Sequence, residues 1–132
     1  MVQIPEKVMQ KLADPATAKV LVTASSTGRP HAIVCGSIAA PSNDKIVVGE
    51  ILMKRAAANL KANSKAAILI VNGMESYEII LKDPVRIAEG PVLDGMNEKL
   101  AAIKLHANAV WMFDVCSVMN QSASPEAGTK IA

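Results

Sequence analysis

The sequence predicts a mainly β domain, folded as an antiparallel β-barrel with flanking helices. Its 132 residues fit a single domain. Short apolar segments rich in Val, Ile and Ala are joined mostly by brief Gly-, Pro- and Asn-containing turns, which favours antiparallel pairing. Strands and helices do not alternate regularly, so a doubly wound parallel sheet is disfavoured. Closure into a barrel, complete or nearly so, removes exposed strand edges.

The first half of the chain is expected to start with a helix and continue as strands. Ile4, Val8 and Leu12 recur at helical spacing, and Pro5 suits a first turn. Strands are then expected over residues 18–25, 31–39 and 45–50, with turns at 26–30 and 41–44.

The second half is expected to add two helices and the remaining strands. Residues 53–63 are rich in Ala, Lys and Leu and favour a helix. Met96, Leu100 and Ile103 mark the last helix. Strands are expected at 65–71, at 76–81 and 85–89 as one hairpin, and at 109–118 with Trp111, Phe113 and Val115 on one face. The total is six to seven strands, with a domain over 1–118 and a polar tail over 119–132.

Composition excludes several classes of function. The 14 basic and 12 acidic residues give a net charge of +2, and Tyr77, Trp111 and Phe113 are the only aromatics, so nucleic acid is not expected as a partner. No apolar run suggests a signal peptide or a membrane span. Cys35 and Cys116 lie in apolar segments, not in a CxxC pair, and are expected to be buried, reduced thiols of a cytoplasmic protein.

Familiar catalytic and metal motifs are missing from the sequence. There is no GxGxxG, GxxxxGK[ST], HExxH or GxSxG pattern. His31 and His106 are far apart in sequence and make a poor case for a metal site. Asp114 is expected to face solvent, and neither Glu50 nor Glu78 belongs to a carboxylate pair suited to acid–base chemistry.

The most suggestive segment is IVVGEILMKRAAANL, residues 46–60. Gly49 is expected to let a ligand approach the backbone closely. Lys54 and Arg55 stand in the first turn of the following helix, where cations oppose the helix dipole. A bound anion would reverse that penalty, because free amides and two cations would converge on it. A solvated basic pair on a surface helix explains the same spacing.

The order of these elements resembles that of the pyridoxamine 5′-phosphate oxidase-like, FMN-binding split-barrel family, particularly its short dimeric members. Three segments and the Gly90-Pro-Val turn carry the likeness, which covers nearly the whole chain. The segments are KVLVTASSTGRPHAIVCGSI, IVVGEILMKRAAANLKANSKAAILI and AVWMFDVCSVMNQS. The G-x-P-H turn is a loose motif, and the strand followed by [KR]-T-x-x-N is more specific.

The resemblance implies that FMN lies in a groove between two subunits of a homodimer. Arg55 matches the basic phosphate ligand, with Lys54 as its neighbour, and Asn59 completes the motif. The flavin ring would be bordered by Val34, Cys35, Gly36 and Ser37 on one side and by Val48, Gly49, Glu50 and Ile51 on the other. The resemblance further implies that His106 and Trp111 approach from the partner subunit and that Asn120 and Gln121 reach the cofactor.

One departure from the family pattern is Ala56, which stands where a phosphate-binding Thr is expected. The missing hydroxyl would cost about 0.5–1.5 kcal/mol of binding free energy. The expected function is an FMN flavoprotein, either an oxidoreductase or an electron-transfer protein, that accepts electrons from a nicotinamide donor or a redox protein. Three alternatives remain open: a non-enzymatic flavin carrier, a cofactor-free dimer acting as a binding module, and a barrel that binds a deazaflavin or haem.

Overall fold

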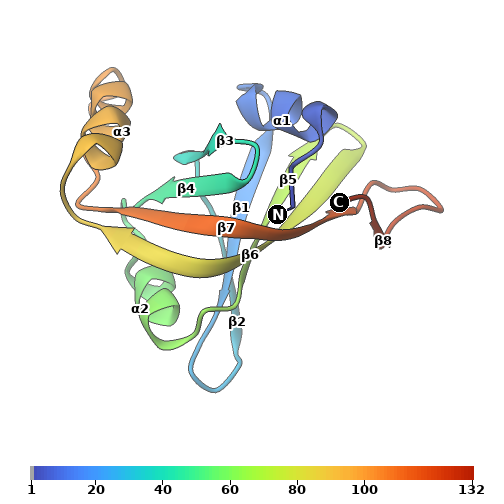
Figure 1. Ribbon diagram of the computed structural model, residues 1–132, viewed down its shortest axis with the longest axis horizontal. Coiled ribbons are helices and arrows are strands. Elements are labelled where there is room, and N and C mark those ends of the chain that lie inside the picture. The colour runs from blue at the N-terminus through green and yellow to red at the C-terminus, as the bar shows by residue number, and fades with distance from the viewer. Residues whose placement is uncertain (1) are drawn as a thin grey trace.

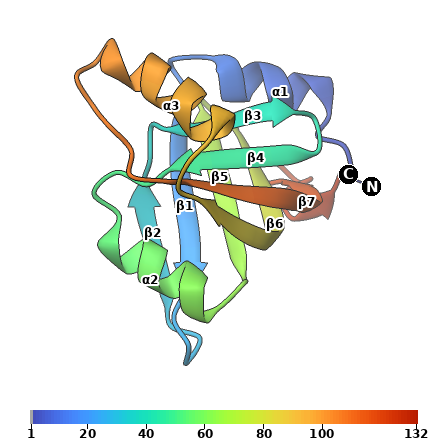
Figure 2. The same ribbon diagram turned by 60° about the vertical axis from the view of Figure 1, so that its left-hand side comes forward.

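The computed structural model describes residues 2–132, and in this range eight antiparallel strands form one curled sheet flanked by three helices (Figures 1 and 2); seven strands follow one path and a short eighth strand pairs beside it. The strand order is β2-β1-β5-β6-β7-β4-β3. The elements are α1 (Glu6–Ala13), β1 (Ala18–Ala24), β2 (Pro30–Val34), β3 (Ile38–Ser42), β4 (Lys45–Gly49), α2 (Lys54–Ala62), β5 (Ala66–Asn72), β6 (Glu75–Ile87), α3 (Pro91–Ala101), β7 (Val110–Asn120) and β8 (Thr129–Lys130). The predicted mainly β, split-barrel architecture is confirmed.

The single strand expected over residues 31–39 is wrong, because the chain breaks between β2 and β3. These two strands are consecutive in sequence but lie at opposite ends of the strand order. The linking segment bonds to both sides: the Cys35 N–H donates to the Lys19 carbonyl in β1, and the Ser37 Oγ donates to the Gly49 carbonyl in β4. Residues 35–37 therefore carry the chain from one end of the sheet to the other.

The hairpin expected across Lys82-Asp83-Pro84 is also wrong. β6 continues through these residues, and both of its halves pair with β7. The register shifts between Lys82 and Val85, and Asp83 has a φ of 52°. Because β7 is 11 residues long, it offers a partner on both sides of this irregularity.

The last helix and the C-terminal segment differ from expectation as well. α3 begins at Pro91 and buries Leu93 and Leu100, whereas Ile103 lies beyond its end and is exposed. β7 runs to Asn120, past the proposed domain boundary at 118. Part of the expected polar tail returns to the sheet: β8 pairs with β7, since main-chain hydrogen bonding needs no apolar pattern.

The core is aliphatic and lies inside the curl of the sheet. α1 contributes Val8 and Leu12, and α2 contributes Ala56 and Leu60, to one cluster around the fully buried Phe113. A smaller cluster lies where α3 covers β4 and β7. No helix within residues 2–132 has the length and apolar character needed to cross a bilayer.

The two cysteines are free, but only Cys35 is partly buried, and Cys116 is exposed. Cys116 is the extra residue at a register shift, because Val115 pairs with Leu81 and Ser117 with Ile80. The expectation that both thiols are buried is wrong for Cys116, which takes the outward position after the buried Val115, and the alternation breaks only after it, where Ser117 and Val118 are both buried.

Candidate functional site

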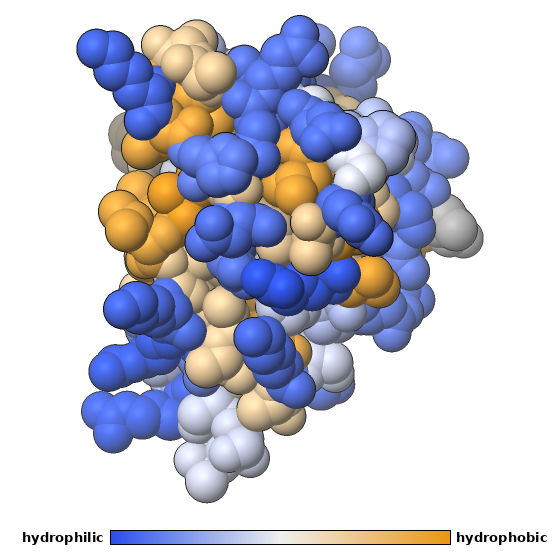
Figure 3. All heavy atoms as spheres, turned by 90° about the vertical axis from the view of Figure 1, so that its left-hand side faces the viewer, coloured by the Kyte–Doolittle hydropathy of each residue, from blue (hydrophilic) through white to orange (hydrophobic). Residues whose placement is uncertain are grey.

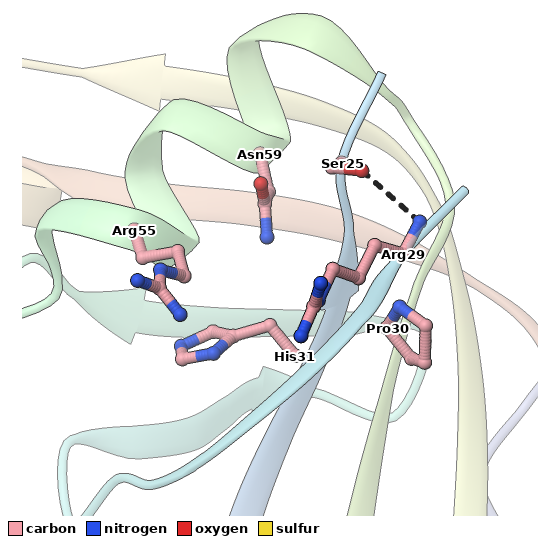
Figure 4. A pocket seen from close by; sticks show the side chains of 6 residues that line it. All are labelled: Ser25, Arg29, Pro30, His31, Arg55 and Asn59. Carbon is pink, nitrogen blue, oxygen red and sulfur yellow. Dashed lines mark hydrogen bonds between the residues drawn. The ribbon is translucent and has the colours of Figure 1, made fainter. Parts of the chain in front are cut away.

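A cavity of about 420 Å³ lies between α2 and the hairpin that joins β1 to β2 (Figure 4). Arg55 reaches it from the first turn of α2, and Arg29 and His31 reach it from the hairpin. The side chains that line it are Ser25, Arg29, Pro30, His31, Arg55 and Asn59. Two chain segments that are distant in sequence thus bring cationic groups to one place.

The cavity carries uncompensated positive charge. No Asp or Glu lines it, and neither Arg29 nor Arg55 forms an ion pair with any residue in the range 2–132. On the face that Figure 3 shows, the most apolar side chains lie mainly in the upper and middle parts, and the lower part shows hydrophilic side chains among weakly apolar ones. Guanidinium groups without carboxylate partners are suited to binding an anion.

Lys54 and Arg55 are adjacent in sequence, but their side chains line different depressions of the surface. Arg55 lines the cationic cavity, whereas Lys54 lines a separate depression together with Glu50, Lys61 and Asn108. Successive residues of a helix project about 100° apart, so the two side chains leave the helix toward different parts of the surface. Of this basic pair, the structure therefore places Arg55 alone at the cationic cavity.

Gly49 does not provide the open backbone that its sequence context predicts. The Ser37 Oγ accepts a hydrogen bond from the Gly49 N–H and donates one to its carbonyl, both at 3.1 Å. A Cβ at position 49 would lie 3.2 Å from the Ser37 Cβ and 3.4 Å from the Met96 Sδ. Close packing within the chain explains the absence of a side chain at position 49, so the glycine by itself does not indicate a ligand.

The helix motif after Arg55 is mainly structural. Ala56 is fully buried in the core cluster, so its side chain does not line the cavity. Asn59 borders the cavity but is 8% exposed, and its Nδ2 donates to the buried Thr23 Oγ1 at 3.0 Å. That bond ties α2 to β1.

The comparisons with known proteins rest on structure. No protein-family model matches the chain, and no curated protein sequence matches it. HupZ from Group A Streptococcus superimposes with a TM-score of 0.83 at 14% identity, covering 98% of this chain and 99% of HupZ. An FMN-binding protein from Syntrophomonas wolfei gives a TM-score of 0.75 at 14% identity, covering 89% of this chain and 88% of that protein. HutZ, a heme storage protein from Vibrio cholerae, gives 0.67 at 13%, covering 92% and 97%.

Other structures that match include candidate pyridoxamine 5′-phosphate oxidases and an F420 reductase. The chain has the pyridoxamine 5′-phosphate oxidase-like split-barrel fold. At these identities the likeness establishes the fold alone, and the split-barrel structures that match it are described with different cofactors.

The burial of Ala56 in this split barrel reverses an expectation drawn from the family pattern. Because the side chain faces the core, Ala56→Thr should add no phosphate contact and should leave FMN affinity unchanged. The added atoms should cost about 1–3 kcal/mol of unfolding free energy through overpacking. Thermal unfolding checks this against Ala58→Thr, a control at an exposed position of α2. A gain in FMN affinity for Ala56→Thr alone would contradict this assignment.

Glu50 belongs to a hydrogen-bonded network on the far side of α2 from the cationic cavity. Its carboxylate accepts two bonds from Arg86, at 3.1 and 2.8 Å, and one from Trp111 Nε1 at 2.9 Å. The Arg86 bonds hold the pKa of Glu50 below its ordinary value of 4.5, with partial burial acting against them and the Trp111 bond acting with them. This carboxylate is already fully engaged within its own chain.

Loss of this network should destabilise the split barrel in acid. Because the pKa of Glu50 is lowered in the folded state, its stabilisation is present at neutral pH and is lost as pH falls below 4.5 toward the folded-state pKa. Glu50→Gln should lower the free energy of unfolding by about 1 kcal/mol at pH 7 and by less near pH 3. Trp111 is the only tryptophan, so its fluorescence reports directly on the network. An equal loss at both pH values would show that the charge is not responsible.

The remaining expected site residues are scattered over the split barrel. Val34 and Gly36 are exposed, whereas Val48 is fully buried and Ile51 packs beneath α3. Cys35 lies 3.2 Å from Ser37 through its thiol.

The residues expected to come from a partner subunit, or to follow the last strand, are equally dispersed. Trp111 is 3% exposed within its own chain, and His106 is exposed beyond α3. Asn120 accepts a bond from the Ser122 N–H, and Gln121 donates to Glu78 on the outside of the sheet. A single chain therefore does not bring these residues to the cavity that holds Arg55.

Ser25, Arg29 and His31 were not predicted as site residues. The segment Gly28-Arg29-Pro30-His31 was identified only as a turn, and its proximity to α2 is a tertiary feature. The available signal was the presence of Arg29 and His31, two residue types that can bind an anion, beside a predicted turn.

Proposed function

We propose that this protein is an FMN flavoprotein in which Arg55 binds the phosphate of the cofactor. The observation that carries the proposal is the cavity itself, where two arginines that form no ion pair within residues 2–132 converge with a histidine and no carboxylate lines the space. This donor set fits a phosphate group. The FMN-binding protein of the same fold supports the choice of cofactor.

The residues have separable roles in this proposal. Arg55 offers a forked contact to phosphate oxygens, and Asn59 holds α2 against β1 so that the arginine keeps its position. Val34, 75% exposed, and Gly36, with open space around it, leave a surface for the ring along the edge of the barrel. Bound FMN would supply the capacity to take up and release electrons, and the chain would orient it.

We further propose a homodimer formed through the outer apolar face of the sheet. Alternation and register place one set of apolar side chains on the side opposite the core, namely Val20, Val22, Ala32, Val34, Ala67, Leu69 and Ile80. The single chain exposes 7393 Å², against roughly 6,700 Å² for a typical monomer of its mass. Gln121 and Glu78 lie beside this face, so dimer formation would place them near the interface.

Within the proposal the protein is an oxidoreductase or an electron-transfer protein that works in the cytoplasm. The two free thiols, Cys35 and Cys116, fit a reducing compartment. Steady oxidation of a nicotinamide donor by the purified protein would identify an enzyme, whereas flavin reduction without turnover would identify a carrier.

The absorption spectrum of the purified protein, with mass spectrometry of any released ligand, tests the cofactor. The proposal expects flavin bands and the mass of FMN, either as purified or after addition of FMN. A Soret band and haem, or a deazaflavin spectrum, would replace FMN with the cofactor found. Failure to bind any of the three would favour the cofactor-free binding module.

A further inference from the structure

We propose that Arg29 and His31 form a second phosphate-binding side opposite Arg55, and that together they select a phosphate monoester over a phosphodiester. The inference rests on the proposed flavin function and names the chemical class that the same site accepts. Figure 4 shows the Arg29 and His31 side chains directed toward the space that Arg55 enters from α2.

The hairpin that carries Arg29 is held rigidly. The Ser25 Oγ accepts hydrogen bonds from the backbone N–H groups of Arg29 at 3.0 Å and Thr27 at 3.3 Å. The Ser25 N–H donates to the Arg29 carbonyl at 2.9 Å. Gly28, with a φ of 87°, allows the tight turn between them. Little backbone freedom is therefore lost when Arg29 binds a ligand.

Two contacts also fix the separation between the hairpin and α2. The Asn63 Nδ2 at the end of α2 donates to the Ser25 carbonyl at 3.0 Å, and the Asn59 Nδ2 donates to Thr23 in β1 at 3.0 Å. The cations on the two sides of the cavity are thus attached to a preorganised frame. Such a frame favours ligands whose charge is concentrated at one point between the two sides.

A phosphate monoester meets that requirement better than a diester does. At neutral pH a monoester carries nearly two negative charges on three terminal oxygens. A diester carries one charge on two free oxygens and a substituent on each side of the phosphorus. Two arginines from opposite sides can balance the charge of a monoester, whereas a diester leaves one cation without a partner. Among flavins, FMN presents a monoester and riboflavin no phosphate. FAD presents a diphosphate substituted at both ends, whose two negative charges are divided between two phosphorus atoms and are therefore not concentrated at one point between the two sides.

Equilibrium titration of FMN, FAD and riboflavin into the full-length protein tests the inference, with Arg29→Gln, His31→Gln and Lys54→Gln compared. We expect the unmodified protein to bind FMN at least about tenfold more tightly than FAD or riboflavin. Arg29→Gln should lose about tenfold or more in FMN affinity, and His31→Gln about threefold or more, with riboflavin affinity unchanged. Lys54→Gln removes one charge outside the cavity and should change FMN affinity less than twofold.

The possible outcomes separate the inference from the function on which it rests. Tight FMN binding that neither Arg29→Gln nor His31→Gln alters, or equal affinity for FMN and FAD, would overturn the inference and leave the flavin function intact. No binding of any flavin by the unmodified protein would overturn both. Unchanged thermal unfolding of the two variants shows that an affinity loss arises at the cavity. If Arg29→Gln does not fold, Arg29→Lys replaces it, because lysine keeps the positive charge but cannot make the two-bond contact of a guanidinium group.

Discussion

Replacement of Arg55 by alanine is expected to weaken FMN binding about tenfold to a hundredfold, whereas Lys54→Ala changes it less than about threefold. The difference follows from geometry, because Arg55 lines the cationic cavity and Lys54 lines another depression. A charge-assisted contact to phosphate is worth about 1.5–3 kcal/mol, which corresponds to the larger change. Both variants lose one positive charge from the first turn of the same helix, so they are closely matched.

Flavin fluorescence titration with FMN and riboflavin measures both effects. Riboflavin has no phosphate and should bind the two variants and the unmodified protein alike. Equal effects of the two substitutions on FMN affinity, or a larger effect of Lys54→Ala, would show that Arg55 has been wrongly assigned as the phosphate ligand and that the assignment is off by one residue.

Leu69→Glu is expected to convert the proposed homodimer to a folded monomer. Leu69 is half-buried near the middle of the outer apolar face, paired with Val20 on one side and Glu78 on the other. In a symmetric dimer each substitution is present twice, and a buried, unpaired carboxylate is strongly unfavourable. A stable interface of this kind buries roughly 1,600 Å² or more in total. Loss of the apolar contact should therefore raise the dissociation constant of the dimer to the micromolar range or higher.

Sedimentation velocity measures this transition. Met74→Glu is the control, because Met74 is 77% exposed in the turn between β5 and β6, away from the outer apolar face. Circular dichroism establishes that Leu69→Glu remains folded. A monomeric unmodified protein at micromolar concentration, or a Leu69→Glu variant that stays dimeric, would contradict the proposed interface.

The sequence predicted the parts of the fold that depend on local patterns. Helical spacing identified α1 through Val8 and Leu12, and alternation identified β7 through Trp111 and Phe113. The break at residues 35–37 and the continuity of β6 were missed, because each depends on a distant partner. Ser37 bonds to Gly49 in β4, and β6 stays extended because β7 pairs with it on both sides of Asp83.

The candidate site shows the same division between local and tertiary information. The pair Lys54 and Arg55 could be noticed because two cations in a helical first turn are locally unfavourable without an anion, and the family resemblance singled out Arg55. Arg29 and His31 were missed, because nothing local indicates that the hairpin lies against α2. The packing of Gly49 against Ser37 and Met96, and the burial of Ala56, where the family pattern has a Thr, are tertiary features that no local pattern indicates.

Calorimetric titration of FMN into the purified, cofactor-free protein, with riboflavin titrated in parallel, tests the central claim most directly. The account predicts saturable binding of one FMN per chain and at least about tenfold lower affinity for riboflavin, because the cationic cavity adds to the binding free energy only through contacts to the phosphate. Absence of saturable FMN binding, or equal affinity for FMN and riboflavin, would contradict it.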